Sequence, residues 1–319
     1  MRTITVFALL ATLLVPMSFT GQIWAAEKVK ISIPVRTAPH YALPMLADEE
    51  KGFSKKEGLE TEWVAFKSGG AQVRALAAGA VDVAITSYTS AVIMAARGIP
   101  AMLVADLKFR QPWKLWVLTK SRIKTSADLK GAKIAVTRTG SLTHIYGRLA
   151  ATAFGLEGSV KFVATGGVPQ ALAALKANTV DTLVMSFMPM ANLIFSGEVR
   201  EAADITQYLP KGQTDVTVIV KREFAKSQPQ TVKKVIKGIS GAAQYAIKNR
   251  KWSIDKLTKI SRYTPKAAEG VLKVLTFSND LTVSEQAVRE TMKLLITYKL
   301  IKPAEAPKVK ELYSNAYLP

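Results

Sequence analysis

The chain has 319 residues, 49% of them apolar, which is more than one hydrophobic core usually holds, so we expect two lobes. It contains no cysteine, which excludes disulfides, thiolate nucleophiles and cysteine metal sites. Its 44 Lys and Arg outweigh 24 Asp and Glu, a net charge of +20, and many of the cations fall between 221 and 273. Apolar residues recur there at helical spacing, which indicates a solvated helix face, available to anions or an anionic membrane, rather than a nucleic-acid site.

Residues 1–25 are predicted to be a signal peptide. Arg2 precedes an apolar run from Val6 to Val15, and small residues follow at Ala25 and Ala26. The run is too short to cross about 30 Å of hydrocarbon, which argues against a membrane anchor. We therefore expect an exported chain that begins at Ala26 and carries a charge of about +19.

Strands and helices alternate in the first part of the remaining chain. Strands are expected at 28–35, 59–66, 81–86 and 101–107, and helices at 41–52, 68–79 and 90–97. Gly52 and Gly79 end two of the helices, because glycine tolerates the left-handed conformation of a helix stop. The alternation predicts right-handed βαβ units and a mainly parallel α/β sheet.

The same pattern then restarts and gives the second lobe. Strands are expected at 132–137, 160–164 and 180–186, followed by a strand at 214–224 and then only helices, the last of which begins with a capping box of Thr282 and Glu285. We expect crossing strands near 116–119 and 216–220. Lobe one then comprises 26–115 and 221–319, and lobe two comprises 116–220.

One stretch occurs twice, once in each predicted lobe. Residues 68–87 read SGGAQVRALAAGAVDVAITS, and residues 165–186 read TGGVPQALAALKANTVDTLVMS. Counted back from the final serine, Ser87 matches Ser186, Asp82 matches Asp181, and Gly79 matches Asn178. The aspartates, Gly79 and Asn178 are interpreted as turn residues, which places the two serines at the opposite ends of their strands.

The two ends of the repeated stretch are candidates for a ligand site. In open α/β sheets, ligands bind beyond the carboxyl ends of the strands, where loops lead into helix N-termini. A hydroxyl followed by two glycines presents free N–H groups that suit an anion. Either glycine pair alone is more simply an ordinary turn, but their duplication favours a site between two lobes.

The sequence gives no indication of catalysis. It lacks the phosphate-loop, dinucleotide, zinc-protease and serine-hydrolase motifs, and it has only two histidines, so we expect no enzyme, no cofactor and no metal site. His40 is either a ligand contact or a helix-start residue. His144 lies one turn into a predicted helix, which favours packing or support of a neighbouring loop.

Three segments resemble a known family. They read ADEEKGFSKKEGLETEWVAF, SGGAQVRALAAGAVDVAITS and ADLKGAKIAV, and they resemble the ABC-transporter substrate-binding proteins of the nitrate, sulfonate, taurine and thiamine-pyrimidine-precursor group. The resemblance implies a two-lobed periplasmic binding protein fold of the two-crossing type (type II). It also implies a periplasmic monomer that closes on a small solute and delivers it to a membrane permease. The alternatives are a pyrimidine-precursor synthase and a sensing module for a membrane receptor.

The resemblance also implies which residues contact the solute. They come from the loop after the first strand, the Ser-Gly-Gly helix start, the first strand end after VDVA and the matching loops of lobe two: Thr37, His40, Tyr41, Ser68, Gly69, Gly70, Ser87, Tyr88, Thr139, Gly140, Ser141, Thr143, Ser186 and Phe187. Hydroxyls and aromatic rings suggest a compact anionic head on an apolar or aromatic body. Arg36, Arg110 and Arg138 are candidates to neutralise the head, and Trp113 either lines the mouth or packs in a core.

Overall fold

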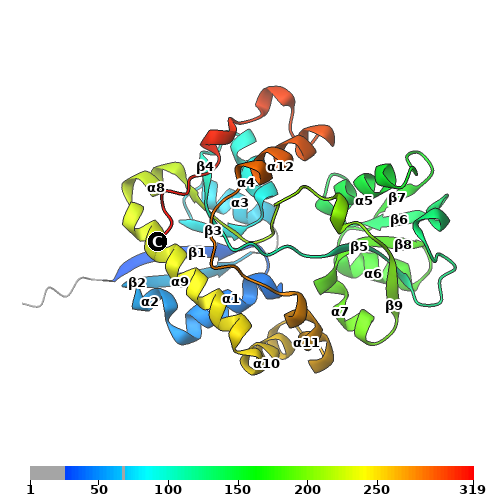
Figure 1. Cartoon of the computed structure of the whole chain (residues 1–319), viewed down its shortest axis with the longest axis horizontal. Coiled ribbons are helices and arrows are strands. Elements are labelled where there is room, and N and C mark those ends of the chain that lie inside the picture. The colour runs from blue at the N-terminus through cyan, green and yellow to red at the C-terminus, as the bar shows by residue number, and fades with distance from the viewer. Residues whose placement is uncertain (1–25, 67–68) are drawn as a thin grey trace, which may run out of the picture.

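The computed structural model describes residues 26–66 and 69–319, so the predicted signal peptide and Ser68 lie outside the described residues. Two five-stranded sheets form two lobes (Figure 1). The first sheet holds β1 (Glu27–Ile33), β2 (Leu59–Ala65), β3 (Val83–Thr86), β4 (Ala101–Asp106) and β10 (Thr217–Lys221). The second holds β5 (Trp113–Leu118), β6 (Lys133–Val136), β7 (Lys161–Ala164), β8 (Thr182–Ser186) and β9 (Val199–Asp204).

The two sheets are built alike. Their strand orders are β2-β1-β3-β10-β4 and β7-β6-β8-β5-β9. The pairs β1–β2, β1–β3, β6–β7 and β6–β8 are parallel, and one strand in each sheet, β10 or β5, is antiparallel to both of its neighbours. The prediction of two mainly parallel α/β lobes is therefore confirmed.

Helices flank both sheets. The first lobe carries α1 (Pro39–Lys51), α2 (Phe53–Lys56), α3 (Gly69–Ala77) and α4 (Tyr88–Ala96). The second carries α5 (Leu142–Ala153), α6 (Val168–Lys176) and α7 (Phe187–Phe195). After β10 the chain is helical: α8 (Arg222–Ser227), α9 (Pro229–Lys248), α10 (Arg250–Ile260), α11 (Pro265–Val274) and α12 (Glu285–Thr297).

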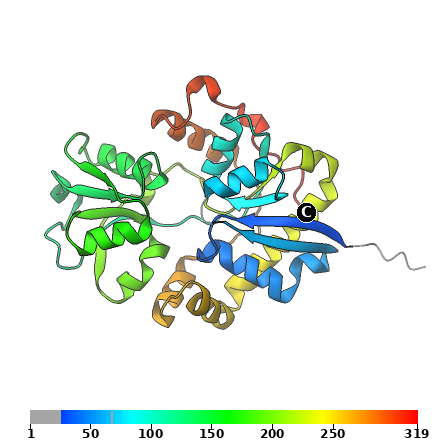
Figure 2. The ribbon, with the colours of Figure 1, turned by 180° about the vertical axis from the view of Figure 1, so that it is seen from behind.

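The crossings lie a few residues before the predicted ones. Residues 116–118 belong to β5, which pairs with β8 and β9 inside the second sheet, and residues 217–220 belong to β10 inside the first. The chain instead passes between the lobes along the segments 107–112 and 205–216 (Figures 1 and 2), the second of which begins with the short 3-10 helix Thr206–Tyr208. Both apolar runs pair within a sheet because a strand that bridged two lobes would leave its backbone groups without ladder partners.

The start of the last long helix also differs from the prediction. Ser284, not Thr282, is the N-cap of α12, and its hydroxyl accepts a hydrogen bond from the Ala287 N–H at 3.3 Å. The Thr282 hydroxyl donates to Asp280 instead, at 2.6 Å. Both residues suit an N-cap by type, so the sequence pattern misplaced the helix start by two residues.

The turn residues of the repeat behave as predicted. Gly79 and Asn178 both have positive φ, 74° and 54°, after the helices α3 and α6. Asp82 accepts a hydrogen bond from the Lys30 N–H, and Asp181 accepts one from the Lys133 N–H, each at 2.8 Å. The middle of the repeated stretch therefore builds the same corner in each lobe.

Candidate functional site

Strand register places the final residues of both repeats beside the crossings. Thr86, at the end of β3, pairs with Thr217, which directly follows the segment 205–216. Ser186, at the end of β8, pairs with Trp113, which directly follows the segment 107–112. Because both crossings join the two sheets, these strand ends lie on the sides of the lobes that face each other (Figure 1). This is the edge at which the sequence predicts a ligand site.

In the first lobe, the helix starts of α3 and α4 meet at this edge. Ser87 is the N-cap of α4, and its hydroxyl lies 2.7 Å from the Thr89 hydroxyl. The Thr86 hydroxyl lies 3.1 Å from that of Ser90. A Cβ on Gly69 would lie 3.9 Å from the Ser90 hydroxyl, which shows how close the first turn of α3 comes. Gly69, Gly70 and Ser87 thus share one corner rich in hydroxyls.

Gln72 supports this corner, and the sequence reasoning missed it. Its side chain is fully buried, and its amide nitrogen donates to the backbone carbonyls of Ser32 and Ile85, which lie near the ends of β1 and β3. Its amide oxygen has no hydrogen-bond partner among the described residues. Gln72 lies four residues before the buried Leu76, so helical spacing alone would have marked it as a polar residue on the buried face of α3.

In the second lobe, three hydroxyls form a triangle at the start of α5. Thr137, Ser141 and Thr143 lie 2.9 to 3.0 Å from one another, and the Thr143 hydroxyl also accepts the Thr137 N–H. Nearby, His144 Nδ1 accepts the Gly140 N–H at 3.0 Å, so this histidine supports the loop. Burial and the charge of Arg148 lower the pKa of His144. Thr139 and Gly140 are exposed at the tip of the loop.

Ser186 and Phe187 complete the edge of the second lobe. Ser186 is the N-cap of α7, and its hydroxyl makes no hydrogen bond within the described part of the chain, although the residue is only 4% exposed. Phe187 is half-buried and packs edge-on against Phe195, with ring centroids 6.5 Å apart. An unpaired hydroxyl at this edge is a group with which a bound solute can form a hydrogen bond.

The first loop contributes differently from what the resemblance implied. Thr37 is exposed in the turn before α1, whereas His40 is buried and its Nδ1 lies 3.3 Å from the Met188 sulfur in the opposite lobe. Burial lowers the pKa of His40 to about 3, so the ring is neutral. The Tyr41 hydroxyl donates to the Asp215 carbonyl at 2.7 Å. His40 and Tyr41 therefore join the first loop to the second lobe and to a crossing.

Tyr88 does not lie at the site. Its side chain is fully buried in the core between α3, α4 and α12, and its hydroxyl donates to Asp106 at 2.8 Å. Trp113 likewise packs in a core, edge-on against Tyr146 with ring centroids 4.7 Å apart. Both aromatic side chains lie in the hydrophobic cores of their own lobes.

The three candidate arginines have different surroundings. Arg36 lies 3.8 Å from a Glu49 oxygen, and Arg110 donates to the Thr206 carbonyl at 2.8 Å, which ties the two crossings together. Arg138 is exposed beside the loop tip of the second lobe and has no acidic partner among the described residues. Arg138 is therefore the candidate whose charge is free for an anion.

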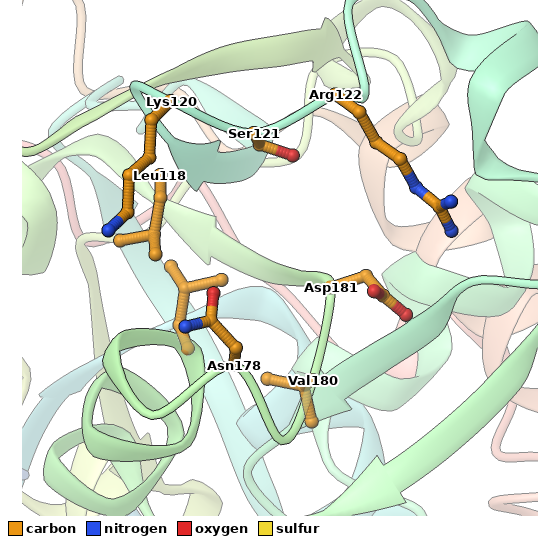
Figure 3. Close-up of a pocket in the computed structure, with 8 residues that line it drawn as sticks. Leu118, Lys120, Ser121, Arg122, Asn178, Val180 and Asp181 are labelled. Carbon is orange, nitrogen blue, oxygen red and sulfur yellow. The ribbon is translucent and has the colours of Figure 1, made fainter.

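A pocket of about 350 Å³ lies at the opposite edge of the second lobe (Figure 3). Lys120, Ser121 and Arg122, from the loop after β5, face Asn178 and Asp181 across its opening. Asp181 is next to the start of β8, so this pocket lies at the far end of the strand that finishes at Ser186. It is separate from the site that the repeat predicts.

Asp215 is a buried carboxyl in the second crossing. Its Oδ2 accepts the Gln111 N–H from the first crossing at 2.8 Å. Burial, opposed by that bond and by the charge of Arg110, raises the pKa of Asp215 to about 6. A raised carboxyl pKa means that the folded state holds the proton more tightly than the unfolded chain, so ionised Asp215 costs stability above pH about 6. This cost disappears as the pH falls to about 4.

We predict that Asp215→Asn increases the free energy of unfolding by about 2 kcal/mol at pH about 7, with little gain at pH about 4. Asparagine keeps the shape and an acceptor for the Gln111 N–H but removes the buried charge. Denaturant unfolding at the two pH values measures the difference. Asp128→Asn is the control, because hydrogen bonds to backbone N–H groups lower the pKa of this exposed carboxyl and the change should act in the opposite direction. A loss of stability at neutral pH in Asp215→Asn would contradict the prediction.

Two kinds of feature are absent from residues 26–66 and 69–319. No three or more His, Asp or Glu side chains come together there in a group that would hold a metal ion. No helix in these ranges combines the length and the apolar character needed to cross a bilayer.

Comparisons with known proteins agree with this geometry. The chain is 26% identical over 291 residues to the taurine-binding periplasmic protein of Escherichia coli strain K12, covering 88% of this chain and 86% of that protein. Its structure resembles the periplasmic aliphatic sulphonate binding protein SsuA of Escherichia coli, with a TM-score of 0.77, 21% identity and coverage of 89% and 91%. The alkanesulfonate-binding protein SsuA of Xanthomonas axonopodis pv. citri, bound to MOPS, gives a TM-score of 0.71 at 20% identity, with coverage of 91% and 100%.

The structural likeness confirms the expected periplasmic binding protein fold. The group that the three sequence segments resemble is also the group to which these relatives belong. The family model described as NMT1/THI5 like matches residues 40–251, which is more than half of the chain. The chain therefore belongs to the NMT1/THI5-like family.

Proposed function

We propose that this chain is an extracytoplasmic binding protein that captures a small anionic organic solute between its lobes and delivers it to an ABC permease. One observation carries the proposal: the ends of the two repeats, at Ser87 and Ser186, lie on facing edges of two sheets joined by two short crossings. Hinged lobes of this kind can close on a ligand that bridges them. A closed state becomes dominant when the ligand prefers it by about 5.5 kcal/mol, which several bridging hydrogen bonds supply.

The chemistry of the site favours an anionic head. The helices α3, α5 and α7 start at or next to Gly69, Ser141 and Ser186, where their N–H groups and hydroxyls favour an anion, and Arg138 adds an uncompensated positive charge. The relatives named for taurine and for aliphatic sulphonates bind solutes that carry a sulfonate group. We therefore propose a sulfonate or carboxylate on an apolar or aromatic body that rests against Phe187.

The proposed contacts follow the predicted set without four of its residues, Ser68, Tyr88, His40 and Tyr41. Tyr88 is left out because its side chain lies in the core, and Ser68 lies outside the described residues. His40 and Tyr41 are not counted as contacts, because the His40 ring lies against the Met188 sulfur and the Tyr41 hydroxyl donates to the Asp215 carbonyl. The proposed contacts are Thr37, Gly69, Gly70, Ser87, Thr139, Gly140, Ser141, Thr143, Ser186 and Phe187, with Arg138 as the counter-ion.

We further propose a periplasmic monomer without catalytic activity. In the described part of the chain, neither His40 nor His144 contacts a carboxylate: one lies against a methionine sulfur and the other accepts a backbone N–H. An acid–base pair for a synthase reaction would need such a partner to orient the imidazole. The relatives' periplasmic location supports the same location for this chain.

Thermal unfolding in the presence of candidate solutes tests the proposal. Alkyl and aryl sulfonates, carboxylates, nitrate and aminopyrimidines should be compared at equal concentration. A solute at about 100 times its Kd is expected to stabilise the protein by about 2.7 kcal/mol, and we expect this effect from a sulfonate or a carboxylate. Stabilisation by cationic aminopyrimidines alone would contradict the anionic head. Stabilisation by none of these solutes would contradict solute capture.

A further inference from the structure

The corner between α9 and α10 carries a cluster of exposed cations. Lys248 ends α9, Arg250 and Lys251 begin α10, and all three are exposed. Arg250 Nη1 donates to the Leu272 carbonyl at 3.4 Å, which brings the exposed Lys273 at the end of α11 beside them. We define the α9–α10 corner as Lys248, Arg250, Lys251 and Lys273. Figure 1 shows α10 and α11 together at the lower edge of the first lobe.

The charges of the α9–α10 corner are not compensated. Within the described ranges, no acidic side chain lies within 4.0 Å of these four cations. Among the nearby carboxylates, Asp255 pairs with Lys259, and Glu50 on α1 accepts from Lys256 and Trp252. The exposed Glu269 lies one helical turn before Lys273 on α11 and makes no ion pair within the described ranges. Residues 221–273 contain 14 Lys and Arg against 3 Asp and Glu, so much of the chain's positive excess is concentrated in this segment.

The surface at this corner is a broad depression rather than an enclosed cavity for one ion. It has a volume of about 650 Å³ and is lined by Lys248, Asn249, Arg250, Lys251, Trp252 and Asp255. Long cationic side chains with exposed ends can lie over such a surface and reach several separate anions. A single small anion would satisfy one or two of these cations, whereas a layer of phosphate headgroups would satisfy all four.

We propose that the α9–α10 corner docks this protein on an anionic phospholipid surface. The occupant follows from charge: uncompensated lysines and arginines on one exposed corner are attracted to anionic headgroups within about one Debye length of the membrane. Docking is independent of the solute site at Ser87 and Ser186. It would hold the protein at the membrane in which the permease of the proposed function is embedded.

Sedimentation with lipid vesicles tests the proposal. The purified protein is expected to bind phosphatidylcholine vesicles that contain phosphatidylglycerol and not vesicles of phosphatidylcholine alone. Raising the salt from about 0.1 M to about 1 M should release it, because the Debye length falls from about 10 Å to about 3 Å. The triple variant Lys248→Glu/Arg250→Glu/Lys251→Glu is expected to lower partitioning by roughly a hundredfold.

A second triple variant separates the corner from net charge. Lys120, Arg122 and Lys124 are exposed in the loop after β5 of the second lobe, and Lys120→Glu/Arg122→Glu/Lys124→Glu changes the net charge by the same amount. We expect this control to weaken vesicle binding by no more than about threefold. An unchanged solute-induced shift in thermal unfolding would show that both variants are folded.

Three results would overturn the proposal. The first is an equal loss of binding in both triple variants, which would mean that only net charge matters. The second is equal binding of the native protein to both kinds of vesicle. The third is no binding to phosphatidylglycerol, which would assign the corner to an acidic protein partner instead. Because solute binding is measured separately, none of these results would be confused with failure of solute capture.

Discussion

Replacing both Ser87 and Ser186 by alanine is expected to lower the affinity for the preferred sulfonate or carboxylate by at least about a hundredfold. A hydrogen bond to a charged group contributes about 1.5–3 kcal/mol, which is roughly a tenfold to hundredfold change for each hydroxyl. Both serines are N-caps at facing strand ends, so the variant removes one contact from each lobe. Isothermal titration calorimetry with the solute that gives the largest thermal stabilisation measures the loss.

The two serines should not contribute equally. The Ser186 hydroxyl has no hydrogen-bond partner within the described residues, so it is free to donate to a solute. The Ser87 hydroxyl already lies 2.7 Å from that of Thr89, which can take over part of its role. We therefore expect the single variant Ser186→Ala to lose more affinity than Ser87→Ala.

Ser196→Ala is the matched control for the Ser186 variant. Ser196 follows the other end of α7, where its hydroxyl donates to the Leu193 carbonyl and lies away from β8. Its removal should leave the affinity unchanged. If the double variant at Ser87 and Ser186 bound the solute as tightly as the native protein, the ends of the repeat would not form the site.

The sequence predicted the lobes well because their signals are local. Apolar runs such as Val83–Thr86 and Thr182–Ser186 are buried along their whole length, as strands covered by helices on both faces must be. Gly79 and Asn178 mark helix stops through backbone preferences that act within a few residues. A repeat of such local signals is visible without any structure.

The predictions for the crossings and for Tyr88 differ from the structure because they depend on tertiary contacts: the strands with which a segment pairs and the core into which a side chain packs. An apolar strand such as Trp113–Leu118 looks the same whether it bridges two lobes or pairs inside one, and only its register with β8 and β9 decides. Tyr88 follows the repeat directly, but the first turn of α4 directs its ring inward toward Asp106. Sequence position alone does not distinguish the two faces of a helix start.

The candidate site also contains features that the sequence could predict and features that it could not. The hydroxyls at Ser141 and Thr143 were predicted from the family resemblance and the hydroxyl at Ser186 from the repeat, and the burial of Gln72 was predictable from its helical spacing to Leu76. The contact between His40 and Met188 was not, because the two residues are 148 positions apart and belong to different lobes. Contacts across lobes follow from the placement of whole elements.

The largest contact between the lobes joins α7 to α11. A Cβ on Gly270, in the middle of α11, would lie 2.1 Å from two ring carbons of Phe195 at the end of α7. The Asn192 side chain also accepts the Thr264 N–H and donates to the Arg262 carbonyl, each at 3.0 Å. Since Ser186 is the N-cap of α7, this contact holds in place the helix start that we propose binds the solute.

We predict that Gly270→Leu lowers the free energy of unfolding by about 3 kcal/mol and weakens solute binding. Leucine cannot occupy the space of the Phe195 ring, so α7 must move away from α11. In a helix position without a steric clash, leucine is favoured over glycine by about 0.8 kcal/mol, so a loss of stability in this variant would point to the contact with Phe195. Denaturant unfolding, calorimetry with the solute and the radius of gyration in solution measure the three consequences.

The double variant Gly270→Leu/Phe195→Ala tests the cause. Removing the Phe195 ring vacates the space into which leucine points, so part of the lost stability and affinity should return relative to Gly270→Leu alone. Phe195→Ala on its own should be destabilised by its lost packing, which fixes the baseline for the double-mutant cycle. If Gly270→Leu were more stable than the native protein, or if the double variant recovered nothing, the lobes would not be held together through this contact. Recovery of stability without affinity would show instead that the contact supports folding but does not position Ser186.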